Sequence, residues 1–238
     1  AQWFGEQLRE RGERGGDEVL VVESAYVLGI AAFWRGRFPS ARKHLELAAR
    51  RYRPEHRSVH LLHYGQDIQV ACHSLLANTL WFLGESAAAT AARDTALALA
   101  DRVGHPLSSA TALFLAGVLA IDMNDEARLR EYSAHLDAMR PDARHVRLGA
   151  DALRGCVDVL DGDRATGIGR IQRAIEFSHS GAPGPGTHAA LDRLLMFACE
   201  ADDDLGTGTE AVERLLRTEG PWRAEAARRC GESHPGNP

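Results

Sequence analysis

Lysine is almost absent from this chain of 238 residues, since Lys43 is the only one. A phosphate-binding loop must end in lysine followed by serine or threonine, whereas Lys43 stands between Arg42 and His44. The sequence therefore excludes ATP binding by such a loop within this chain. Arginine carries the remaining positive charge, the net charge is −5, and no basic stripe is visible, which argues against a nucleic-acid-binding surface.

Long hydrophobic runs are missing as well. Every apolar stretch is interrupted before it reaches the roughly 20 residues that a membrane-spanning helix needs. No segment has the pattern of a secretory signal peptide, so we expect a cytoplasmic protein or fragment without membrane contact.

The familiar catalytic motifs are absent too. The sequence contains neither GxSxG nor HExxH, and the spaced oxygen ligands of a calcium loop are missing. The acidic run 202–204 is interpreted as a solvated helix end. We therefore expect no enzymatic activity and no cofactor.

Cysteine is scarce, and none of the four cysteines forms a CxxC pair: they are Cys72, Cys156, Cys199 and Cys230. Three of them fall within predicted core helices, which favours free buried thiols and a reducing compartment.

Three histidines stand at spacings of four and three, at His56, His60 and His63. On a helix they would share one face, and imidazoles so placed can hold zinc. They alternate with leucines and charged residues, however, so scattered histidines without a metal are the preferred interpretation.

The dominant pattern in the chain is a small residue, a turn residue seven positions later, and a second small residue five positions after that. It occurs at Gly29, Gly36 and Ala41, at Ala77, Gly84 and Ala89, at Gly155, Gly162 and Gly167, at Cys199, Gly206 and Ala211, and in worn form at Gly117, Asn124 and Leu129. This is the skeleton of a tetratricopeptide (TPR) helix pair, although the turns recur at longer intervals than the usual period of about 34 residues. We expect the stack to flex most easily at the worn copy.

The predicted fold is all-α, a right-handed superhelix of about five TPR-like helix pairs with partial repeats at both ends, forming one domain over 1–238. Its predicted parts are a trailing helix at 1–16, repeats at 17–54, 68–105, 106–141, 145–178 and 188–219, an insertion at 55–67, and the start of a further repeat with a tail at 222–238. Small residues allow the two helices of a pair to approach closely, as at Gly29 against Ala41 and Ala77 against Ala89.

Several local signals fix the ends of the predicted helices. Asp17 can cap the helix that follows it, and Gly104 and Pro106 suit a tight turn between two helices. The glycines at 36, 84, 162 and 206 permit the left-handed backbone that ends a helix.

Two irregular segments interrupt the repeats. The insertion carries Leu61, Leu62 and Tyr64, so we expect it to pack back onto the stack. Residues 178–187 contain three glycines and two prolines, which predicts a mobile, non-helical linker.

Repeat stacks bind ligands on the concave face, which the first helix of each pair lines. The candidate binding residues are Tyr26, Ile30, Phe33, Trp34, Ser74, Asn78, Trp81, Phe82, Phe114 and Val118. An aromatic groove with one amide and one hydroxyl suits a small-molecule pocket or a docked amphipathic helix.

The alternative for these candidates is packing. Phe33 and Phe82 can fill the interior between neighbouring repeats, and Trp34 and Trp81 can pack under the turn. Asn78 requires a partner in an apolar face, because an unpaired amide costs about 1–3 kcal/mol, and that partner can be a neighbouring helix.

Three short stretches are more specific than a generic repeat: YGQD at 64–67, LWFLG at 80–84 and GHP at 104–106. They resemble the C-terminal TPR sensor region of large bacterial STAND/AAA-type signalling ATPases. The AEAARRCGE stretch near the end is similar to the closing helix of that group. In these proteins the repeats follow a nucleotide-switch domain, and the output is an adenylate cyclase or a transcriptional activator of the antibiotic-regulator (SARP) or LuxR kind.

The resemblance implies a non-catalytic sensor that binds an effector or a partner protein on its concave face. Binding would then control an attached ATPase, and this chain itself would not bind nucleic acid. The competing interpretation is a free-standing scaffold that joins two proteins and has no small-molecule site.

Overall fold

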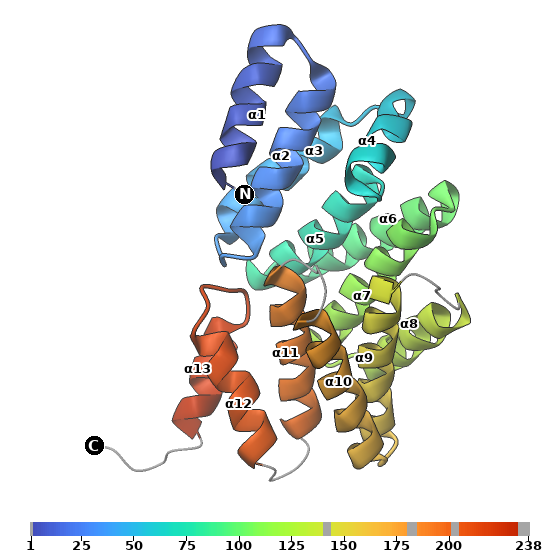
Figure 1. Cartoon of the computed structure of the whole chain (residues 1–238), viewed down its shortest axis with the longest axis vertical. Coiled ribbons are helices and arrows are strands. Elements are labelled where there is room, and N and C mark those ends of the chain that lie inside the picture. Colours follow the sequence, from blue (N-terminus) through green and yellow to red (C-terminus); the bar gives the residue numbers. More distant parts are fainter. Residues whose placement is uncertain (1, 140–143, 180–184, 201–204, 233–238) are drawn as a thin grey trace. The chain divides into compact units, whose positions relative to one another are not determined.

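The computed structural model describes residues 2–139, 144–179, 185–200 and 205–232. Across these ranges every regular element is helical, with α-helices joined by short turns (Figure 1). The predicted all-α fold is therefore confirmed. None of the described helices is both long and apolar enough to cross a lipid bilayer.

The helices follow one another closely along the chain. Their bounds are α1 Gln2–Gly15, α2 Glu18–Phe33, α3 Phe38–Arg51, a 3₁₀ helix Pro54–His56, α4 Arg57–Tyr64, α5 Ile68–Phe82, α6 Ser86–Val103, α7 Pro106–Asp122, α8 Glu126–Ala138, α9 Arg144–Leu160, α10 Arg164–His179, α11 Pro185–Glu200, α12 Leu205–Leu216 and α13 Arg223–Glu232. Consecutive helices pack in adjacent pairs, which is the architecture of a helical-repeat protein.

The chain divides into two compact units, Ala1–Leu119 and Ala120–Pro238, where the sequence suggests one continuous domain. The boundary falls inside α7, two residues after Gly117. This is the worn copy of the repeat pattern, in which Leu129 fills the slot of a small residue and is buried. Each unit is described below by itself.

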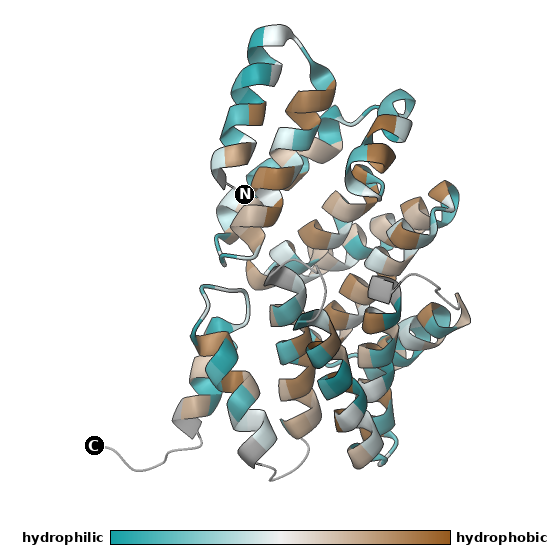
Figure 2. Ribbon diagram, viewed as in Figure 1, coloured by the Kyte–Doolittle hydropathy of each residue, from teal (hydrophilic) through white to brown (hydrophobic). Residues whose placement is uncertain are grey.

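In the first unit, α2 packs against α1 and α3, while α5 packs against α3 and α6. Figure 2 shows hydrophilic bands along α1 and hydrophobic bands along α2. The sequence of α2 is apolar nearly all round, as expected for a helix with neighbours on several sides. Asp17 caps α2 as predicted, because its carboxylate accepts hydrogen bonds from the backbone N–H groups of Val19 and Leu20.

The predicted turn glycines are confirmed at three of four positions. Gly36, Gly84 and Gly162 have φ values of 67°, 79° and 91°, and Asn124 takes the same role with φ 57° because asparagine tolerates the left-handed region. Gly206 is the exception. It lies in the first turn of α12 and so does not end a helix.

Small residues bring paired helices together, but not always the predicted partners. A Cβ added to Gly29 would lie 2.7 Å from Cδ2 of Leu45, so Gly29 faces Leu45 one turn beyond Ala41. In the second unit, Gly155 on α9 and Gly167 on α10 face each other directly. There the two backbones touch with no side chain between them.

The insertion folds into the short helix α4, which packs against α5 as predicted. The predicted reason is only partly right. Leu62 is 83% exposed, whereas His60 is completely buried and Tyr64 is half-buried. Polar contacts described below hold this segment to the stack.

The prediction of a non-helical linker at 178–187 is wrong at both of its ends. The helix α10 continues to His179, and the hydroxyl of Ser178 donates to the carbonyl of Ile175. Pro185 begins α11, a position that proline tolerates because the first N–H of a helix needs no intrahelical partner. The remainder of that prediction lies outside the described residues, as does the acidic run 202–204.

A buried ion pair ties together three parts of the second unit. Arg193 on α11 donates to Asp122 at the end of α7, and both side chains are about 6% exposed. The indole N–H of Trp222 donates to the second oxygen of the same carboxylate at 2.9 Å. Burial raises the pKa of Asp122, while Arg193 and the Trp222 hydrogen bond oppose that rise.

Candidate functional site

The ten predicted binding residues divide by exposure. Five are no more than 3% exposed and belong to the interior of the first unit: Tyr26, Phe33, Ser74, Asn78 and Val118. The other five are half-buried: Ile30, Trp34, Trp81, Phe82 and Phe114. Only the second group presents surface to a ligand in this conformation.

The aromatic residues near the first turn pack on one another. Phe33 is fully buried and contacts the rings of Trp34, Phe38 and Phe82. Phe38 and Phe82 stack with centroids 4.6 Å apart and an interplanar angle of 11°. These contacts join α2, α3 and α5, so interior packing between two repeats accounts for Phe33 and for much of Phe82.

Asn78 serves as a tie between helices. Its amide nitrogen donates to the carbonyl of Ser74 on its own helix and, at 3.2 Å, to the carbonyl of Leu115 on α7. The hydroxyl of Ser74 in turn donates to the carbonyl of Val70. The alternative interpretation of Asn78, a hydrogen bond to a neighbouring helix, is confirmed.

Tyr26 also makes its contacts within the first unit. Its hydroxyl accepts a hydrogen bond from the side-chain amide of Gln66, and Gln66 accepts one from the hydroxyl of Thr111. The ring of Tyr64 meets Tyr26 edge-on at 5.4 Å. Burial raises the pKa of Tyr26, so this phenol stays neutral. A binding role remains a prediction for the half-buried group of five.

The insertion is held by a carboxylate on α2. Glu23 is buried, and its Oε1 lies 3.2 Å from Nδ1 of His60 and 2.8 Å from Nδ1 of His63. The histidine spacing noted in the sequence therefore places two imidazoles on one buried carboxylate. No cluster of three or more potential metal ligands occurs among the described residues.

A second buried carboxylate, Asp67, lies between α4 and α5, at the end of the same segment. Its Oδ2 accepts hydrogen bonds from the hydroxyl of Tyr52 at 2.6 Å and from Nε of Arg57 at 2.9 Å. Its Oδ1 accepts the backbone N–H of Val70 and so caps α5, while its own N–H donates to Ser108. These bonds link α4, α5 and α7, which is a structural role.

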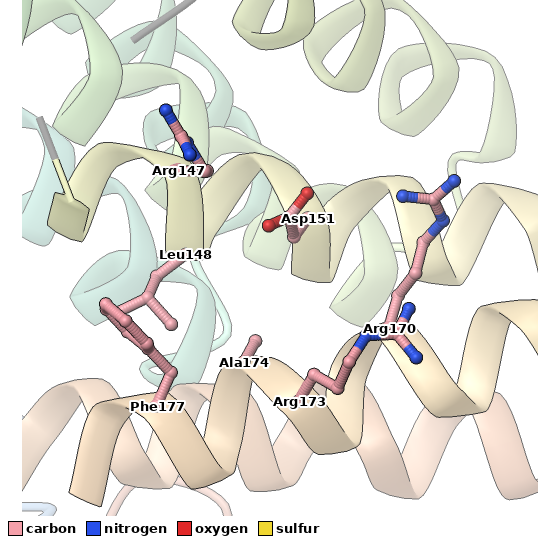
Figure 3. Close-up of a pocket in the computed structure, with 7 residues that line it drawn as sticks. All are labelled: Arg147, Leu148, Asp151, Arg170, Arg173, Ala174 and Phe177. Atoms are coloured by element: carbon pink, nitrogen blue, oxygen red, sulfur yellow. The ribbon is translucent and has the colours of Figure 1, made fainter. Parts of the chain in front are cut away.

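The second unit carries a cavity of about 570 Å³ along α9 and α10 (Figure 3). Leu148 on α9 and Phe177 on α10 approach each other across it, and Ala174 lies beside them on α10. Arg147 and Asp151 of α9 and Arg170 and Arg173 of α10 supply the polar part of its wall. We call this the α9/α10 groove.

The charges of this groove are only partly neutralised by the protein. Asp158 binds Arg170 at 2.7 Å and Arg154 at 2.9 Å, so these arginines are occupied. Within the described residues, the side chains of Arg147 and Arg173 have neither an ion pair nor a hydrogen bond, and both are exposed. Each of these two guanidinium groups can donate to an anion at the wall of the groove.

The first unit has its own groove, of about 350 Å³, which lies over α2 between α1 and α3. We call it the α2 groove. Its floor consists of α2 residues that are mostly small, including Ser24, Ala25, Ala31 and Ala32. Its charged rim is formed by Glu6, Arg9, Glu13, Arg35, Arg37 and Lys43.

The α2 groove faces away from the predicted binding surface. Successive residues of a helix are about 100° apart, so positions 21, 25, 28 and 32 share one side of α2. The candidate positions 26, 30 and 33 fall on the opposite side. The hollow on this part of the chain is therefore not on the face that the repeat pattern indicates.

His44 lies in the wall of the α2 groove, close to the positive charges of Lys43 and Arg9. Burial lowers the pKa of His44, and the charges of Lys43 and Arg9 lower it further. The unfolded chain therefore binds more protons than the native protein just below pH 6.5, and stability decreases as the pH falls through that range.

Urea unfolding of the unchanged chain is expected to give a lower free energy of unfolding at pH 5.5 than at pH 7.5. The H44Q variant is expected to show a smaller decrease. The two proteins differ only at position 44, so the difference between them isolates the imidazole. An identical pH dependence in both proteins would contradict the prediction.

Comparison with protein-family models and with curated proteins finds no match to this chain.

Sequence reasoning found the helical scaffold but missed both grooves. The sequence contains one signal for the α9/α10 groove. Arg147, Asp151, Arg154 and Asp158 follow one another at spacings of four, three and four, which places them on one helix face. The partners on α10 are not foreseeable from that spacing alone. The α2 groove depends on three helices together and has no comparable local signal.

Proposed function

We propose that this chain is a non-catalytic recognition domain that binds a small anionic effector in the α9/α10 groove. The observation that carries this proposal is the pair of exposed guanidinium groups, Arg147 and Arg173, beside the apolar surface of Leu148 and Phe177. Arginine suits carboxylate or phosphate because its planar fork offers two parallel donors.

The size and composition of the groove support this role. Ligand sites usually occupy about 300–1,000 Å³ and combine apolar lining with a few polar groups that orient the ligand. Asp151, half-buried on the same wall, disfavours a second negative charge near it and can accept a donor group of the ligand. A molecule with one anionic group, one donor and an apolar part fits best.

The wider role follows the resemblance of the sequence to the repeat region of signalling ATPases. In that setting, effector binding shifts an attached ATPase between two states, which requires different affinity for each. Sequencing the DNA upstream of Ala1 tests this part. An ATPase domain in the same reading frame is the expected result, and a start codon directly before Ala1 would contradict it.

The binding role is tested by thermal unfolding of the chain in the presence of individual metabolites that carry a carboxylate or phosphate. A true effector at 100 times its dissociation constant stabilises the native state by about 2.7 kcal/mol, which is a clear increase in Tm. The R173A and R147A variants are expected to lose the ligand-induced increase while keeping the Tm of the free chain.

W81A is the matched variant on the aromatic face predicted from the sequence. If W81A abolishes the increase and R173A does not, the effector binds on that face instead of the α9/α10 groove. If no metabolite raises the Tm, the sensor proposal fails. The free-standing scaffold, which joins two proteins without a small-molecule site, then becomes the better interpretation.

A further inference from the structure

We propose that the α2 groove is a docking site for an amphipathic helix of a partner protein, with acidic residues along one edge of that helix. The inference goes beyond the proposed effector site, because it concerns a different unit and a different surface. It assigns a protein partner to the first unit, whereas the effector belongs to the second.

The shape of the groove favours a helix. Both α1 and α3 pack on α2, and the slot between them is floored by the side chains of a single helix. The lining runs along α2 from Val21 to Ala32, which corresponds to about 17 Å at 1.5 Å per residue. A helix of about three turns matches that length.

The composition of the floor allows close contact. Ala25 and Ala32 are buried small residues, and Ala31 and Ser24 lie beside them. Small side chains leave room for the large apolar side chains of a second helix, which insert as ridges into a groove. Leu28 and Leu47 add apolar surface along the same slot. The partner should therefore present leucine-sized residues at helical spacing.

The charges on the rim of the groove indicate the charge that a partner should carry. On the α3 side stand Arg37 and Lys43, whose side chains have no ion-pair partner among the described residues. On the α1 side Arg9 is balanced by Glu13, with 3.6 Å between their charged atoms. Positive charge is thus concentrated along one edge of a chain whose net charge is −5. An acidic edge on the docked helix complements it and suppresses basic partners.

The test uses two labelled 16-residue amphipathic peptides that differ only along one edge. Both carry leucines at positions that share one helix face, and one has glutamates where the other has lysines. Fluorescence anisotropy with the full chain is expected to show about tenfold tighter binding of the glutamate peptide. The preference should weaken as salt is added, because the rim charges are exposed.

Three variants of the chain locate the binding. Combining R37E with K43E should reverse the preference, so that the lysine peptide binds more tightly. A31L, which projects into the slot, should weaken binding of both peptides about tenfold without changing the Tm. R53E is the matched control, because Arg53 is exposed and outside the groove, and it should leave the preference unchanged.

Several results would overturn the docking site. They are equal binding of the two peptides, binding unaffected by the R37E and K43E changes, and binding of simple fatty acids with no binding of either peptide. Self-association of the free chain that A31L abolishes would identify a second copy as the occupant and would equally contradict the proposal. The effector test above uses Arg147 and Arg173 in the other unit, so either proposal can fail while the other stands.

Discussion

Replacing Gly155 by alanine is expected to destabilise the second unit by about 2–4 kcal/mol, a large effect for one methyl group. The new Cβ would lie 2.6 Å from the carbonyl oxygen of Gly167 and 2.8 Å from Cγ1 of Ile171. The oxygen belongs to the backbone of α10, so relief requires the two helices to separate. G167A meets the backbone of Gly155 in the same way.

The matched control for this prediction is G169A, on α10 two residues after Gly167. A Cβ at Gly169 meets only the end of the flexible Arg173 side chain, at 3.3 Å. Because alanine favours a helix interior over glycine by about 0.5–1 kcal/mol, G169A should leave the Tm unchanged or raise it. Thermal unfolding followed by circular dichroism compares the three variants. A Tm for G155A equal to that of G169A would show that the close approach of α9 and α10 is wrong.

Asp67 to alanine is expected to cost about 2–4 kcal/mol, because it removes the acceptor of a buried hydroxyl and of a partly exposed arginine, and removes a helix cap as well. The change leaves the hydroxyl of Tyr52, the guanidinium of Arg57 and the N–H of Val70 without their acceptor. The segment that contains α4 should then detach more readily from the stack. Urea unfolding measures the loss of stability, and hydrogen exchange of residues 57–64 locates it.

D17A separates the two causes of this effect. Asp17 caps α2 as Asp67 caps α5, but its surroundings are exposed and it pairs with no cation among the described residues. Loss of the cap alone should therefore cost about 1 kcal/mol. If D67A and D17A were equally destabilising, the buried contacts of Asp67 with Tyr52 and Arg57 would contribute nothing, contrary to the structure.

The repeat scaffold was accessible from the sequence because its signals are local. Turn residues such as Gly36 and Gly84 need a left-handed backbone whatever surrounds them, and Asp17 and Pro106 act within their own helix turn. The same reasoning failed at Gly206, which lies in the first turn of α12 instead of ending a helix. Local chemistry specifies the kind of element more firmly than its exact bounds.

The candidate binding face was less predictable, for a reason visible at Phe33 and Asn78. Both lie on the helix face that lines the concave side of a regular repeat stack, yet both are buried by neighbouring helices. An aromatic or amide at such a position has the same sequence signature whether it meets a ligand or a neighbouring helix. Burial is a property of several helices together, and only their packing resolves it.

Taken alone, the sequence determined that this chain is a stack of paired helices, since small and turn residues at fixed spacing act through contacts within one or two helices. Tertiary structure decided where the surface is hollow and where charge is unpaired. The α2 groove combines Arg9, Ala31 and Lys43 from three helices, and the α9/α10 groove combines Arg147 with Arg173. Such sites depend on how several helices pack together, and no local pattern encodes that.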